Sequence, residues 1–204
     1  MQTDISHRLV LASASPARRA LLKAAGIDAD VVVSGVDESI VEAEDAYTLS
    51  LALARMKART VAGGMPAEPG VLILGCDSVL AFDGQILGKP GDASEAVKRW
   101  QMMRGRSGVL HTGHHLTDLV GGQQAEEVGT TVVHFADVSD AEIEAYVATK
   151  EPLQVAGAFT IDGRGGAFVE RIEGDPSNVI GLSLPLLRRL LAELNISITE
   201  LWRS

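Results

Sequence analysis

Hydroxyl and guanidinium side chains gather around the predicted start of a helix near the N-terminus. Ser13, Ser15, Arg18 and Arg19 follow a short apolar run at residues 8–12. Helix N-termini present unpaired N–H groups and a partial positive charge, so they suit anions. Hydroxyl groups add donors, and the forked guanidinium matches phosphate oxygens. The segment therefore predicts a phosphate-binding site; the alternative is an ordinary serine cap followed by solvated arginines.

Acidic side chains follow two other predicted strands. Asp77 comes directly after the continuous apolar run 71–76, which is typical of a strand covered on both faces. A carboxylate at the carboxyl end of such a strand can hold a metal or accept a proton from an attacking water, and a turn-forming aspartate is the alternative. Asp37 and Glu38 offer oxygen ligands for a divalent ion, although adjacent acids are more often simply solvated.

Two lysines and three histidines complete the set of candidate side chains. Lys57 lies beside the apolar face of a predicted helix, and Lys89 lies between a glycine and a proline. Each ammonium can contact a phosphate, and solvent exposure is the alternative for both. His111 and His115 would share one face of a strand while His114 points to the other, so we expect no metal centre from these three.

Interleaved helices and strands must position these residues. Apolar patterns predict strands at 8–12, 29–34, 71–76, 78–82, 85–87, 109–120, 127–136, 156–161 and 167–172. Caps and helical spacing predict helices at 16–26, 45–62, 92–103, 139–148 and 184–194. Because several neighbouring strands form antiparallel hairpins, the pattern indicates a mixed α/β fold. No linker interrupts it, so one domain over residues 1–204 is expected.

Composition limits the classes of partner. The chain has 27 acidic and 18 basic residues, a formal net charge of −9, which disfavours binding to nucleic acid. Phosphate must therefore be handled locally. Cys76 is the single cysteine, which excludes an internal disulfide and indicates a reducing compartment. The apolar runs are shorter than the roughly 20 residues of a membrane helix, so we predict a soluble cytoplasmic protein with no membrane contact.

Taken in order, these motifs resemble the Maf family of nucleoside triphosphate pyrophosphatases, and the resemblance spans nearly the whole chain. It rests on Leu-Ala-Ser13-Ala-Ser-Pro-Ala-Arg18-Arg, Gly-Val-Asp37-Glu38, Ala-Arg-Met-Lys57-Ala, Gly-Cys-Asp77-Ser78, Leu-Gly-Lys89-Pro and the segments 146–157, 162–166 and 178–185. The resemblance implies two lobes around a cleft, an architecture related to the inosine-triphosphate pyrophosphatases, and often a homodimer.

The same resemblance implies hydrolysis of a nucleoside triphosphate between its α and β phosphates, assisted by a divalent cation such as Mg²⁺ or Mn²⁺. Asp77 corresponds to the family's proton acceptor and, with Glu38, to its metal-associated acids. The positions that correspond to polar residues around the phosphates are Ser13, Arg18, Lys57 and Lys89, and Ser15 and Arg19 complete the predicted phosphate site.

Departures from the family pattern leave the nucleobase open. Ala17 stands where the family commonly has a basic residue. Branches that act on thymidine and uridine triphosphates commonly carry Thr and Gln at the positions of Ser78 and Asp162, and the 7-methyl-guanosine triphosphate branch carries Glu at the latter.

A competing hypothesis is a nucleotide-sensing regulator of septum formation that binds without turnover. Asp77 together with Glu38 favours the enzyme, because a sensor needs no water-activating acid.

Overall fold

A mixed seven-stranded sheet forms the centre of the molecule in the computed structural model, which describes residues 7–202. The strand order is β2-β1-β3-β5-β6-β7, and β4 pairs with β3 beside this path. The strands are β1 (Arg8–Leu11), β2 (Asp30–Val31), β3 (Val71–Phe82), β4 (Gln85–Leu87), β5 (Ser107–Asp118), β6 (Gln124–Phe135) and β7 (Val169–Glu173). β1 runs parallel to β2 and β3, whereas the other pairs are antiparallel, which confirms the predicted mixed α/β class.

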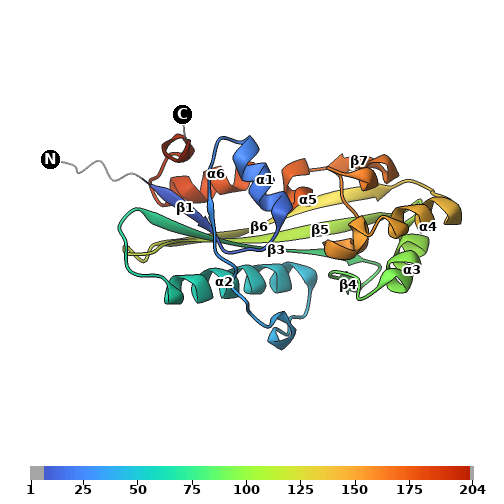
Figure 1. The fold of residues 1–204 in the computed structure, drawn as a ribbon, viewed down its shortest axis with the longest axis horizontal. Helices are drawn as coiled ribbons and strands as arrows, with labels where there is room; N and C mark the ends of the chain where they lie inside the picture. The colour runs from blue at the N-terminus through green and yellow to red at the C-terminus, as the bar shows by residue number, and fades with distance from the viewer. Residues whose placement is uncertain (1–6, 203–204) are drawn as a thin grey trace.

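Helices cover both faces and one end of this sheet (Figure 1). The helices are α1 (Pro16–Ala24), α2 (Ala46–Gly64), α3 (Ala93–Met103), α4 (Asp140–Ala148), α5 (Pro176–Ile180) and α6 (Leu184–Glu193). Short 3-10 turns lie at η1 (Glu38–Ile40), η2 (Glu151–Gln154), η3 (Ala156–Ala158), η4 (Arg164–Phe168) and η5 (Ile198–Leu201). α1, α5 and α6 lie on one face, α2 lies on the other, and α3 and α4 lie at the far end. Within residues 7–202, no helix has both the length and the apolar character needed to cross a membrane.

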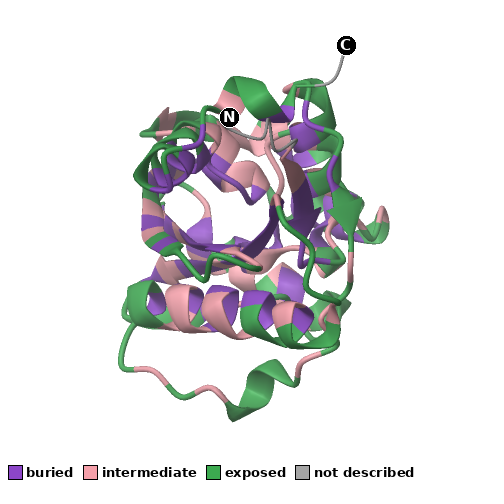
Figure 2. Ribbon diagram, turned by 90° about the vertical axis from the view of Figure 1, so that its left-hand side faces the viewer, coloured by how far each residue is buried: buried purple, intermediate pink, exposed green. Residues whose placement is uncertain are grey.

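Two glycines allow α2 to lie directly on the sheet. A β carbon on Gly75 would lie 2.1 Å from the carbonyl oxygen of Ala54, and one on Gly113 would lie 2.2 Å from that of Ser50. Such close approach of two backbones requires residues without side chains. The buried residues of α2 face the sheet, whereas the segment that contains η1 lies on the side of α2 away from the sheet (Figure 2). The sheet therefore fixes the position of every side chain that α2 directs toward it, Lys57 among them.

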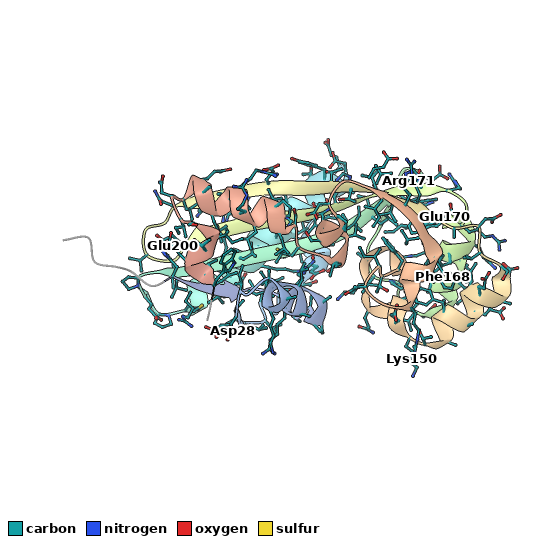
Figure 3. The ribbon with its side chains drawn as sticks, turned by 90° about the horizontal axis from the view of Figure 1, so that it is seen from above. Asp28, Lys150, Phe168, Glu170, Arg171 and Glu200 are labelled. Carbon is teal, nitrogen blue, oxygen red and sulfur yellow. The ribbon has the colours of Figure 1, made fainter. Side chains whose placement is uncertain are left out.

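Separate apolar cores occupy the two ends of the long strands. One core packs α1 and α6 against the first half of β3, a second surrounds Trp100 of α3 at the far end, and a third, smaller one packs α2 against β1 and β3. Phe168 and Lys150 lie toward this far end, and Asp28 and Glu200 toward the opposite end (Figure 3). The first core ends at Cys76 on β3 and the second begins at Leu80, which agrees with the predicted division into two lobes.

The predicted strand at 156–161 is wrong. Residues 156–158 form the turn η3, because Gly157 and Ala158 adopt positive φ angles of 70° and 60° that a strand does not contain. The indole Nε1 of Trp100 donates to the carbonyl of Ala158 at 2.7 Å and holds this turn in the second core. The fold instead includes α5, a five-residue helix that the apolar pattern does not reveal.

Candidate functional site

One edge of β3 lacks a strand neighbour in its middle, and Asp77 lies in this gap. β1 pairs with residues 71–74 and β4 with residues 80–82, so residues 75–79 have no strand partner on that edge. The prediction that Asp77 follows the end of a strand is therefore wrong, since β3 continues without a break on both sides of it. Buried backbone groups need hydrogen-bond partners, so something other than a strand must serve this edge.

The guanidinium group of Arg18 occupies that edge. Its Nη1 donates to the carbonyl of Cys76 at 2.9 Å, and its Nη2 donates to the Ser78 hydroxyl at 3.0 Å. Nη1 also donates to the Ser13 hydroxyl at 2.9 Å, and Nε donates to the carbonyl of Gly181 at 2.6 Å. Since a guanidinium has five N–H donors, these bonds leave one for a ligand.

The start of α1 has the form that the sequence predicts. Pro16 is its first residue, and the Ser15 hydroxyl accepts from the backbone N–H of Arg18 at 3.4 Å. The Ser13 hydroxyl accepts from the backbone N–H of Ser15 at 3.2 Å. Arg19 is exposed at this helix start, whereas Ser13 and Arg18 are buried.

Lys57 joins two carboxylates from different segments. Its ammonium lies 2.5 Å from Oδ1 of Asp77 and 2.6 Å from Oε1 of Glu38 in η1. Lys57 and Asp77 are buried, whereas Glu38 is exposed. Burial raises the pKa of Asp77, and the charges of Lys57 and Arg18 only partly oppose this effect. The site therefore contains an unusually basic carboxylate beside a buried cation.

A hydroxyl relay that the sequence does not reveal fixes the Ser78 side chain. The Thr112 hydroxyl donates to the carbonyl of Asn178 at 3.0 Å, so in its 2.9 Å contact with Ser78 it must accept. Ser78 thus donates to Thr112 and accepts from Arg18. Thr112 and Asn178 are fully buried. In the sequence, Asn178 lies in the segment 178–185 that matches a family motif, but nothing there indicates its role.

The three histidines diverge, as expected. His114 lies toward α6, where its Nε2 accepts from the backbone N–H of Ser183 at 2.8 Å, so its Nδ1 carries the proton and faces the carbonyl of Thr112. Burial lowers the pKa of His114 to about 4, which keeps it neutral. His111 and His115 lie on the α2 side, and the ring of His111 packs against Tyr47.

Lys89 and Asp162 are not joined to the other predicted residues. Both are exposed, and within residues 7–202 neither side chain forms a hydrogen bond or an ion pair. Asp162 belongs to a loop that is held by the Glu151 carboxylate, which accepts from the Thr160 hydroxyl at 2.6 Å and from the backbone N–H of Gly165 at 3.0 Å. No motif in the sequence indicates this role for Glu151.

Asp77 and Glu38 are the side chains in this site that suit a divalent cation. Both present hard oxygen donors to one point, which the Lys57 ammonium now contacts. Mg²⁺ is commonly held by one or two carboxylates together with substrate phosphates, so this donor pair fits such an ion. Across residues 7–202, no group of three or more His, Cys, Asp or Glu side chains is arranged to hold a metal without a substrate.

Comparisons with known proteins identify the family. The sequence model described as Maf-like protein matches residues 8–194. A nucleoside triphosphate pyrophosphatase of Salinispora tropica is 65% identical over 204 residues, covering 99% of this chain and 90% of the relative. One of Streptomyces coelicolor is 58% identical over 196 residues, covering 96% and 95%. The Ham1 protein of Staphylococcus aureus gives a TM-score of 0.44 at 15% identity, covering 64% of this chain and 72% of that structure. The chain belongs to the family of Maf-like proteins.

Proposed function

We propose that this protein hydrolyses nucleoside triphosphates to a nucleoside monophosphate and pyrophosphate. The observation that carries the proposal is the buried Asp77 carboxylate, 2.5 Å from the Lys57 ammonium at the unpaired edge of β3. Relatives that are 65% and 58% identical over nearly the whole chain bear the name nucleoside triphosphate pyrophosphatase, which supports this activity.

A triphosphate requires local positive charge in this acidic chain. The start of α1 supplies the partial positive charge of a helix N-terminus, and Lys57 supplies a buried ammonium close by. We assign phosphate contacts to Ser13, Ser15, Arg19, Lys57 and Lys89. Ser78 and Asp162 are the side chains that we assign to the nucleoside, with the base itself left open. Cations concentrated at one edge of β3 allow binding of a polyanion despite a net charge of −9.

Asp77 performs the proton transfer in this proposal. An oxygen of water forms a bond to phosphorus while the anhydride bond between the α and β phosphates breaks, and the water proton passes to the Asp77 carboxylate. Because burial raises the pKa of Asp77, its carboxylate is a stronger base than an exposed aspartate. Asp77 and Glu38 would hold the divalent cation, which supplies charge neutralisation to the phosphates.

The test is pyrophosphate release from a panel of canonical and modified nucleoside triphosphates, with Mg²⁺ or Mn²⁺. We expect turnover of at least one triphosphate and a loss of about 10²- to 10⁴-fold in Asp77→Asn. Asp83→Asn is the matched control, because Asp83 lies in the exposed turn after β3 and pairs only with Arg106 at 3.1 Å. An absence of turnover with every triphosphate, or full activity in Asp77→Asn, would refute the proposal; binding without turnover would favour the regulator.

A further inference from the structure

Arg18 contacts β3 on both sides of Asp77. It donates to the Cys76 carbonyl before Asp77 and to the Ser78 hydroxyl after it, at 2.9 and 3.0 Å. No strand pairs with this edge between residues 75 and 79, so the guanidinium replaces the missing ladder partner. A strand held at one edge alone would leave the direction of the Asp77 side chain less well defined.

We propose that Arg18 is a positioning residue that fixes Asp77, and that it acts through the protein and not as a main phosphate ligand. This inference rests on the proposed role of Asp77 in hydrolysis. Four hydrogen bonds to protein acceptors already use most of its donors, and the side chain is buried. Gly181 packs against it so closely that a β carbon there would lie 3.0 Å from Nε. The guanidinium therefore cannot turn toward a ligand without breaking these bonds.

The acceptors around Arg18 require a planar fork. Nε points to the Gly181 carbonyl while the two terminal nitrogens serve Cys76 and Ser78. A lysine has one ammonium and cannot reach acceptors spread around a guanidinium plane, although it keeps the charge. Arg18→Lys thus removes the hydrogen-bond geometry of the guanidinium while it keeps the positive charge. Thr112 is a second position at which to test this role. It is 0% exposed, so it cannot touch a substrate, and it is linked to Arg18 only through Ser78.

The experiment compares kcat and KM for pyrophosphate release in Arg18→Lys, Thr112→Val and Thr112→Ser. A misplacement of about 1 Å can lower turnover about 100-fold, so we expect kcat to fall by about 10- to 100-fold in the first two, with KM within about threefold of the wild-type value. Thr112→Ser should restore kcat because it restores the hydroxyl. Arg171→Lys, an exposed change on β7, is the control and should leave both constants unchanged.

A rise in KM of about tenfold or more with unchanged kcat in Arg18→Lys would overturn the inference, since that result identifies a phosphate ligand. Wild-type kcat in Thr112→Val would also overturn it. If Arg18→Lys does not fold, Thr112→Val and its serine rescue carry the kinetic test. If the wild type hydrolyses no triphosphate, the proposed function fails separately. Amide hydrogen exchange across residues 75–79 then decides: faster exchange in Thr112→Val supports positioning, and equal exchange overturns it.

Discussion

The backbones of α2 and β3 lie in close contact at Gly75, so an added methyl group there tests how α2 brings Lys57 to Asp77. A β carbon on Gly75 would lie 2.1 Å from the carbonyl oxygen of Ala54 and 2.9 Å from the backbone nitrogen of Ala58. Both are helix backbone atoms, so no side-chain rotation can relieve the overlap. In Gly75→Ala, the helix must therefore move away from the sheet.

The expected cost of Gly75→Ala follows from that overlap. Overpacking of a core typically costs about 1–3 kcal/mol, and a backbone clash puts this change at or above the upper end. For a domain of this size, about 3 kcal/mol lowers the melting temperature by about 6–12 °C. Because a shift of about 1 Å can lower turnover about 100-fold, the folded fraction should also lose most pyrophosphate release. Thermal unfolding followed by circular dichroism and steady-state kinetics at a temperature below both transitions measure the two effects.

Gly63→Ala on the same helix is the matched control. A β carbon at Gly63 meets no atom within 4 Å, and alanine is the better helix former by up to about 1 kcal/mol. We expect this variant to melt at or slightly above the wild-type temperature with unchanged kinetics. The reasoning is refuted if Gly75→Ala melts with the wild type, or if the two variants lose stability equally.

Three further predictions concern side chains outside the proposed reaction. Hydrogen bonding from Arg55 lowers the pKa of Glu126 from 4.5 to about 2. The contribution of Glu126 to stability is therefore present above about pH 4.5 and lost as the pH falls toward 2. The unfolding free energies of the wild type and Glu126→Gln should differ by about 1–3 kcal/mol at neutral pH and converge at acid pH. A difference that stays constant with pH would contradict this prediction. Glu151→Gln should speed amide hydrogen exchange across residues 160–166 by about tenfold, because the N–H and hydroxyl donors of that loop lose their charged acceptor. Exchange at the wild-type rate would show that the loop does not need the carboxylate. Burial raises the pKa of Cys76 to about 12, so a thiol reagent should label the native protein only on unfolding, and rapid labelling near neutral pH would count against that burial.

Features that depend on a few neighbouring residues, such as helix ends and tight turns, could be predicted from the sequence. Ser15 and Pro16 mark the start of α1, and the backbone of Gly26 adopts the left-handed φ of 80° expected just after its end. Asp83 and Gly84 form the predicted turn between β3 and β4. In each case the residue type fixes a local conformation or hydrogen bond, so no information from distant parts of the chain is needed.

Arrangements that depend on distant segments could not be predicted in the same way. The helix start indicated an anion site at Arg18, but its acceptors Cys76 and Gly181 lie 58 and 163 residues away along the chain. The apolar run before Asp77 suggested a strand end, because a buried charge normally interrupts a buried strand. β3 instead continues, since Arg18 and Lys57 supply the compensating cations that make the buried carboxylate tolerable.

The gap in strand pairing explains why the candidate site lies where it does. β3 contributes side chains to the apolar clusters at both ends of the molecule, whereas β1 pairs only with its first residues and β4 only with its last. Residues 75–79 lack a strand partner on that edge, and side chains from both faces of the sheet reach them. Arg18 comes from α1 on one face and Lys57 from α2 on the other (Figure 1). Burial raises the pKa of Asp77, and Arg18 and Lys57 partly oppose that rise. Removal of either cation would leave the buried carboxylate with less compensation, so Asp77 depends on both helices.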